Sequence, residues 1–226
     1  MVTLMIGNVH SRLVSDDVAV VHAVADRLAV PVVGAKYTKW FKSGKWDGRH
    51  RFLERPNNRF LTGLLPIVLD EIQKRGVWDE RQDDQRPHVE PNTGFAFTWR
   101  GPTLRDYQEE VLQYALKARR GIIRVGTGGG KTVSAGRLIA DLRVPTLFLV
   151  HRKELAEQTA ARFLEWFADV PVGLIGQGCW NPQLITVAMI QTLYARLKSD
   201  PKGTRAFLNS RQLVIADDCH RGGADS

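Results

Sequence analysis

The sequence predicts an α/β protein in which a small α+β domain precedes a larger domain built around a parallel sheet. Three observations lead to this prediction. From residue 104 onward, short apolar runs alternate with amphipathic segments of helical length. A glycine-rich loop separates the first of these runs from the helical segment that follows it. A polar stretch at residues 77–102 divides this region from the first part of the chain.

The small domain is expected at residues 1–76. Strand-like sequence covers residues 2–14, and Ser15 or Asp16 is expected to cap the first helix. Pro31 ends that helix. A second helix is expected at residues 64–75, with Gly76 as its stop. The first helix is predicted from apolar residues at helical spacing, namely Val18, Val21, Val24, Ala25 and Leu28.

Residues 77–102 are expected to form a linker, and residues 103–226 the larger domain. Helices are predicted at 104–118, 132–142 and 153–167, and strands at 121–125, 146–150, 184–188 and 213–216. Strands that alternate with helices in this way indicate a parallel sheet covered by helices on both faces.

A basic and aromatic segment lies inside the small domain. Between Lys36 and Arg59 there are eight basic and two acidic residues, and aromatic residues are interleaved with them. Asp47-Gly48 is a hairpin-turn signal. A basic hairpin with aromatic side chains suits phosphate contact and base stacking; alternatively, the aromatic residues form the domain core and the charges a solvated face. The candidate nucleic-acid contacts are Lys42, Lys45, Trp46, Arg49 and Arg51.

The overall composition allows a nucleic-acid partner. The chain has 226 residues, a formal net charge of +8 and a pI of about 9.8, which suits a polyanion. Its two cysteines exclude a disulfide scaffold and fit a reducing cytosol. No apolar run approaches the roughly 20 residues of a membrane span. We therefore expect a cytoplasmic protein without a membrane partner.

A phosphate-binding loop is the most specific motif. Gly126, Thr127, Gly128, Gly129, Gly130, Lys131 and Thr132 follow an expected strand and open an expected helix. Glycines let backbone N–H groups surround phosphate oxygens, and the helix N-terminus favours negative charge. Lys131 is expected to reach the β- and γ-phosphates of ATP, and the Thr132 hydroxyl to bind Mg²⁺. The long form of the motif needs glycine at Val125, whereas a shorter form that starts at Gly126 fits.

An acidic pair ends the last predicted strand. Asp217 follows Lys131 by 86 positions (217 − 131), which leaves room for the intervening strand–helix units. Asp217 is expected to hold Mg²⁺ through water. Asp218 is expected to orient and deprotonate the attacking water, so that Lys131, Asp217 and Asp218 are the catalytic candidates.

These motifs together resemble those of the superfamily 2 helicases of the DEAD/DEAH-box type. Asp217-Asp218-Cys219-His220 resembles their D-E-x-H box, with the shorter Asp218 in place of glutamate. The resemblance implies a RecA-like P-loop NTPase fold, with ATP and Mg²⁺ as cofactors and DNA as partner. It also implies that His220 couples the nucleotide site to the rest of the motor. Residues 104–108, 150–158 and 186–193 resemble three further motifs of this family. The resemblance implies that Gln108 reads adenine and that Arg152, Gln191 and Thr192 approach nucleic acid.

The small domain is similar to the N-terminal domain of the UvsW-like phage helicases, which remodel branched DNA, at residues 41–52 and 63–65. This family also has a second RecA-like domain, for which the sequence has no motifs. We therefore expect the ATP- and DNA-binding half of a motor, unable to unwind DNA alone, whose second domain could come from another chain. Two alternatives stay open: a restriction-type translocase subunit, and a non-catalytic DNA-binding module with a vestigial nucleotide pocket.

Overall fold

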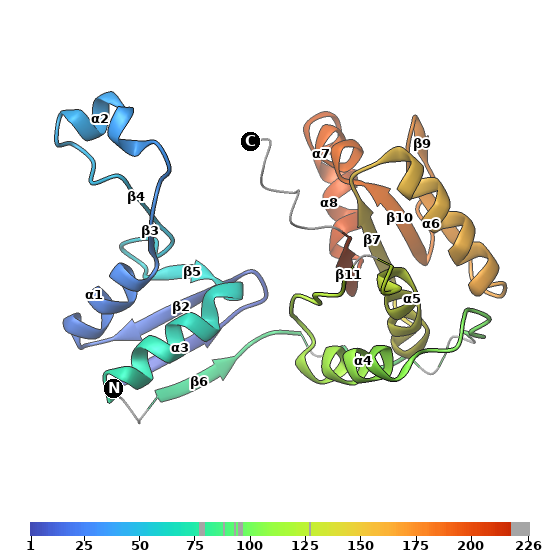
Figure 1. Cartoon of the computed structure of the whole chain (residues 1–226), viewed down its shortest axis with the longest axis horizontal. Helices are drawn as coiled ribbons and strands as arrows, with labels where there is room; N and C mark the ends of the chain where they lie inside the picture. Colours follow the sequence, from blue (N-terminus) through green and yellow to red (C-terminus); the bar gives the residue numbers. More distant parts are fainter. Residues whose placement is uncertain (77–79, 88, 93, 95–96, 127, 218–226) are drawn as a thin grey trace. The chain divides into compact units, whose positions relative to one another are not determined.

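The computed structural model describes residues 1–76, 80–87, 89–92, 94, 97–126 and 128–217 (Figure 1). The chain divides into two compact units, Met1–His88 and Val89–Ser226. Each unit contains its own sheet and its own cluster of buried apolar side chains.

The first unit contains a four-stranded sheet with the order β5-β2-β1-β6. Strands β1 (Val2–Ile6) and β2 (His10–Ser15) form an antiparallel pair within the segment predicted to be strand-like. Strand β5 (Arg59–Leu61) pairs with β2, and β6 (Glu80–Asp84) runs parallel to β1. Residues 80–84 were expected to be linker, so the first unit extends further along the chain than the sequence indicated.

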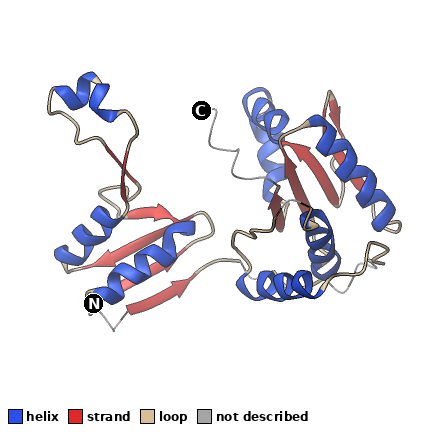
Figure 2. Ribbon diagram, viewed as in Figure 1, coloured by secondary structure: helices blue, strands red, loops and turns tan. Residues whose placement is uncertain are grey.

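Two helices, drawn in blue beside the sheet in Figure 2, contribute to the buried apolar core of this unit. Helix α1 (Val18–Arg27) begins after Asp17, whose carboxylate accepts the N–H of Ala19. Helix α3 (Leu65–Lys74) follows a short 3₁₀ turn, η2 (Thr62–Leu64), and packs against α1. The core combines strand and helix side chains, including Leu4, Leu13, Val24, Phe60, Val68 and Ile72.

Residues 29–51 form a projection that we call the arm. Its stem is the antiparallel pair of β3 (Ala29–Pro31) and β4 (Arg49–Arg51). Its tip contains the 3₁₀ turn η1 (Ala35–Tyr37) and the short helix α2 (Lys39–Lys42). Figure 1 shows α2 standing away from α1, α3 and the sheet of the first unit. The prediction of a hairpin with its turn at Asp47-Gly48 was wrong. The whole tip connects β3 to β4, and Asp47-Gly48 lies between the tip and β4.

The second unit contains a five-stranded sheet with the order β11-β7-β10-β8-β9. Strands β7, β8, β10 and β11 are mutually parallel, and the two-residue β9 is antiparallel to β8. The strand bounds are β7 Thr146–Val150, β8 Val172–Gly176, β9 Cys179–Trp180, β10 Ile185–Met189 and β11 Leu213–Ala216.

Helices cover both faces of this sheet. On β7, Leu147 joins a buried cluster with Leu193 and Phe207, while its neighbour Phe148 joins a second cluster with Phe163. Successive strand residues point to opposite faces, so the two clusters lie on opposite sides. The predicted α/β fold with a helix-covered parallel sheet is confirmed. The helices are α4 Asp106–Ala118, α5 Lys131–Leu142, α6 Lys153–Trp166, α7 Ile190–Ser199 and α8 Pro201–Asn209.

Two sequence expectations for this unit were wrong. Residues 121–125 are not in a strand, and Ile122 and Ile123 are 85% and 47% exposed. An apolar run this short does not by itself specify a strand. Residues 121–125 do not pair with the sheet, in which β7 is the one described neighbour of the end strand β11. Phe97 and Trp99, in the expected linker, instead pack into the core of this unit.

Candidate nucleotide and nucleic-acid site

The glycine-rich loop runs into the first turn of α5, as the motif requires. Gly130 caps the helix with φ +72°, and Gly128 has φ +78°, a left-handed conformation that favours glycine. A Cβ on Gly129 would lie 2.3 Å from the Val125 side chain, so this position also requires glycine. Lys131 and Thr132 are the first two residues of α5. Their N–H groups have no acceptor within the helix and are therefore available to an anion.

Helix α4 holds this loop from one side. The Gln108 amide donates from Nε2 to the carbonyl of Gly129 (3.1 Å) and accepts the N–H of Arg105 through Oε1 (2.9 Å). The Tyr107 hydroxyl donates to the same Gly129 carbonyl (2.9 Å). Gln108 is only 4% exposed. The predicted adenine reader is thus in direct contact with the phosphate loop, and Tyr107 is a loop contact that the sequence interpretation missed.

The carboxyl ends of three parallel strands bring the other predicted residues to one edge of the sheet. Met189 of β10 lies opposite Val150 of β7, and Ala216 of β11 lies opposite Leu149. Candidate residues lie within three positions of each strand end: Arg152 after β7, Gln191 and Thr192 after β10, and Asp217 after β11. In open α/β sheets, ligands bind outside the carboxyl ends of the strands.

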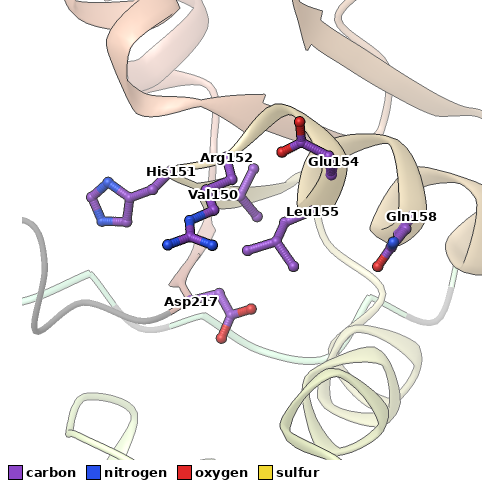
Figure 3. A pocket seen from close by; sticks show the side chains of 7 residues that line it. All are labelled: Val150, His151, Arg152, Glu154, Leu155, Gln158 and Asp217. Carbon is purple, nitrogen blue, oxygen red and sulfur yellow. The ribbon is translucent and has the colours of Figure 1, made fainter.

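Arg152 and Asp217 line a pocket of about 460 Å³ at this edge (Figure 3). The ring nitrogen Nε2 of His151 is buried and has no hydrogen-bond partner among the described residues. The Asp217 N–H donates to the carbonyl of Leu149 (2.9 Å), which fixes the backbone at the end of β11. The pocket lining also includes His151, Glu154 and Gln158, which the sequence interpretation did not single out, and none of the phosphate-loop residues that the structure describes.

In the arm, two of the predicted nucleic-acid contacts form hydrogen bonds to other residues of the arm. Trp46 Nε1 donates to the carbonyl of Arg49 (2.9 Å), and Arg51 Nη1 donates to Asp47 Oδ1 (3.0 Å). The Arg51 hydrogen bond, followed by the Arg49 N–H, lowers the pKa of Asp47. Lys42 and Lys45 are exposed at the tip. Three other predicted positions, Thr127, Asp218 and His220, lie outside the described residues.

The fold and the loop define the class of protein: an α/β P-loop NTPase domain. Residues 101–226 match the family model described as type III restriction enzyme, res subunit. The match covers more than half of the chain, so the chain belongs to this family. It is thereby a member of the superfamily 2 helicases and translocases.

Two curated relatives support this assignment. The chain is 36% identical to IRC3 of Saccharomyces cerevisiae over 55% of this chain and 20% of IRC3. The name of that protein describes it as an ATP-dependent helicase. It is 34% identical to the DNA 3'-5' translocase XPB2 of Sulfurisphaera tokodaii, over 52% of this chain and 25% of XPB2. The chain thus spans a quarter or less of the length of these relatives.

The similarity to solved structures extends over both units. A crystal structure of the UvsW helicase from bacteriophage T4 superposes with a TM-score of 0.74 over 97% of this chain and 83% of that chain, at 19% identity. A second structure of T4 UvsW gives a TM-score of 0.73 over 97% of this chain. At this identity the similarity establishes the fold. None of the helices in the described part of the chain is long and apolar enough to cross a membrane.

Proposed function

We propose that this chain is the ATP- and DNA-binding part of an ATP-dependent DNA translocase that remodels branched DNA. The observation that carries this proposal is the loop before α5. Its backbone conformation favours glycine at Gly128 and Gly130, the Val125 side chain excludes a Cβ at Gly129, and two side chains of α4 hold the Gly129 carbonyl. The family match supports a motor, and the two-unit similarity to UvsW supports the branched-DNA assignment.

ATP would bind with its phosphates on the loop and on the first N–H groups of α5. Lys131 would neutralise charge on the β- and γ-phosphates. The Gln108 amide, after its two hydrogen bonds, retains one N–H and one acceptor lone pair, which an adenine edge could use. Asp218 would orient the attacking water and His220 would couple the site to the motor; both roles rest on the family motif.

Mg²⁺ would enter with ATP. Thr132 and Asp217 offer oxygen atoms, the donor type that Mg²⁺ prefers, and Asp217 would act through water. Among the described residues, no three acidic, histidine or cysteine side chains gather as a ready-made metal site. This fits a metal ion whose ligands are mainly phosphate oxygens and water. When bound, the ion would neutralise charge that develops on the transferred phosphoryl group.

DNA would contact two places. Arg152, Gln191 and Thr192 follow the strands at the carboxyl edge of the sheet, where backbone N–H groups and polar side chains suit phosphates. On the arm, Lys42, Lys45 and Arg49 would contact phosphates. We assign Trp46 and Arg51 to holding the arm together, because both already have hydrogen-bond partners there.

Lys131→Ala tests the nucleotide site. We expect ATP affinity to fall by at least about tenfold, since a charge-assisted contact to phosphate contributes about 1.5–3 kcal/mol. The thermal unfolding temperature should stay unchanged, because a side chain at the start of α5 contributes little to the core. The measurement is calorimetric titration with a slowly hydrolysed ATP analogue, and Lys117→Ala, an exposed lysine on α4, is the control. Equal affinities of Lys131→Ala and the parent would refute the nucleotide site.

A restriction-type translocase is the second candidate, because the matching family model carries that description. The two candidates differ in their preferred DNA. A branch-remodelling protein should bind a forked or four-way junction more tightly than linear duplex of equal length. Equal affinity for the two substrates would favour the restriction-type reading. Failure of ATP to bind the parent chain would favour the non-catalytic DNA-binding module.

A further inference from the structure

Exposed aromatic side chains are concentrated at the tip of the arm. Tyr37 is 72% exposed and Trp40 is 64% exposed, whereas large aromatic side chains are usually well buried on average. Val33, in the same loop, is fully exposed at 101%. The tip therefore presents uncovered apolar and aromatic surface away from the core of the first unit.

The tip is a folded element, so this exposure does not come from a loose loop. The Thr38 hydroxyl donates to the Ala35 carbonyl (2.7 Å) and accepts the N–H of Phe41 (3.3 Å) at the start of α2. Gly48 is buried, and a Cβ there would lie 3.0 Å from both Ala35 and the Phe41 ring. The Phe41 ring thus packs on Gly48 while its side chain stays 40% exposed, and Tyr37 and Trp40 are exposed still further.

Lysines surround the two exposed rings. Lys36, Lys39, Lys42 and Lys45 occur at every third position, all are exposed, and residues 34–46 include no acidic residue. The Lys36 ammonium lies 5.2 Å from the centre of the Tyr37 ring, and the Lys45 ammonium lies 5.8 Å from the centre of the Trp40 ring. Each ammonium lies over one ring, and the rings remain 72% and 64% exposed, so positive charge and exposed aromatic surface occur together at the tip.

We propose that the tip of the arm binds unpaired DNA, with Trp40 and Tyr37 stacking on bases and the four lysines contacting phosphates. Phosphate contact alone would explain the lysines but not the uncovered rings. Stacking needs the face of a base, which single-stranded DNA offers all along its length and a duplex offers only at its ends. This inference rests on the proposed function, because it takes DNA as the substrate.

The rings could instead receive a protein partner. The four lysines favour a polyanion, since charged residues, and lysine in particular, are depleted in the centre of protein–protein interfaces. Unpaired DNA satisfies the rings and the charges together. Comparing the binding of single-stranded and duplex DNA separates stacking from phosphate contact alone and from a protein-docking surface.

The test compares two labelled DNAs by fluorescence anisotropy with the full chain at one salt concentration: an oligo(dT) strand and a blunt duplex of equal length. Trp40→Ala and Tyr37→Ala should each weaken oligo(dT) binding by at least about fivefold, the low end for loss of one base–aromatic stack. Duplex binding should change much less. Tyr114→Ala, at a tyrosine that is 66% exposed on α4, should leave both affinities unchanged.

Trp40→Phe and Trp40→Leu keep the test decisive if Trp40→Ala alters folding. Phenylalanine retains a flat ring and leucine does not, so the phenylalanine variant should bind oligo(dT) more tightly than the leucine variant. Equal oligo(dT) binding by all variants and the parent would overturn the proposal, as would equal losses on strand and duplex. In either case ATP binding, and its loss in Lys131→Ala, would leave the proposed motor function standing. A parent chain that bound neither DNA would overturn both.

Discussion

At the scale of single residues, the carbonyl of Gly129 is the point where α4 and the phosphate loop meet. It accepts hydrogen bonds from Tyr107 and Gln108, and Gln108 in turn satisfies the first turn of its own helix. A Cβ on Gly130 would lie 2.4 Å from Gln108 Nε2, so the contact also needs glycine at that position. The shape of the loop therefore depends on residues more than twenty positions upstream.

Tyr107→Phe and Gln108→Ala should separate the two contacts to the Gly129 carbonyl. Tyr107→Phe removes one partly exposed hydrogen bond and should destabilise the second unit by about 0.5–1.5 kcal/mol. Gln108→Ala should cost more, about 1–3 kcal/mol, because it removes both hydrogen bonds of a buried side chain and leaves the part-buried N–H of Arg105 without its acceptor. Both variants should also weaken ATP binding. Thermal unfolding and calorimetric titration measure these effects, and ATP affinity unchanged in Gln108→Ala would show that α4 does not shape the site.

At the scale of elements, the sequence predicted best where periodicity and packing agree. The helix predicted at residues 153–167 is observed as α6; of the residues at helical spacing Leu155, Thr159, Phe163 and Phe167, the last three are buried and Leu155 is partly buried against the core. The prediction of a strand at residues 121–125 was wrong because an apolar run of five residues does not specify the strand with which it would pair. Strand β6 was missed because its sequence, Glu-Arg-Gln-Asp-Asp, has no apolar signal and owes its pairing to β1.

The candidate site, too, was predicted from the sequence only in part. Motif spacing located the phosphate loop and the residues after β7, β10 and β11. The arm was misread because Asp47-Gly48 resembles a two-residue turn, whereas a whole helical tip lies between the strands that it was expected to join. The separation of outward Tyr37 and Trp40 from structural Trp46 could not be predicted, since it depends on hydrogen bonds made in three dimensions.

Phe163→Ala tests the packing of α6 against the sheet. Phe163 is fully buried and contacts the rings of Phe148, Trp166 and Phe167, with centroid distances of 5.3–6.0 Å. Its truncation should destabilise the second unit by about 3–5 kcal/mol through lost burial and a residual cavity. Leu164→Ala, at the next residue of the same helix and 57% exposed, is the control. Urea titration followed by far-ultraviolet circular dichroism measures both; comparable losses would contradict the packing described here.

At the scale of the whole molecule, the net charge of +8 is unevenly distributed. Four lysines stand on the tip of the arm without an acidic neighbour in residues 34–46, whereas Arg51 on the stem is hydrogen-bonded to Asp47. Charge at the tip can replace condensed counterions on DNA, and charge already held by a carboxylate does so less effectively.

Lys42→Gln and Lys45→Gln together should therefore flatten the salt dependence of DNA binding. Each lost phosphate contact should lower the magnitude of the slope of log K against log salt by about 0.9 for duplex and about 0.7 for single strands. Arg51→Gln should change the slope less, since its guanidinium already has a partner. Anisotropy titrations over a range of salt concentrations give the slopes, and an unchanged slope in the double variant would exclude Lys42 and Lys45 as phosphate contacts.

The position of β11 at the end of its sheet has a consequence for the protein in solution. One edge of this strand pairs with β7, and no strand among the described residues pairs with the other. Val214 on this strand is 55% exposed. An edge strand that carries an exposed apolar side chain can pair with a strand from another molecule. We therefore expect reversible association of the purified protein, seen as a sedimentation coefficient that rises with concentration and stays constant in Val214→Lys.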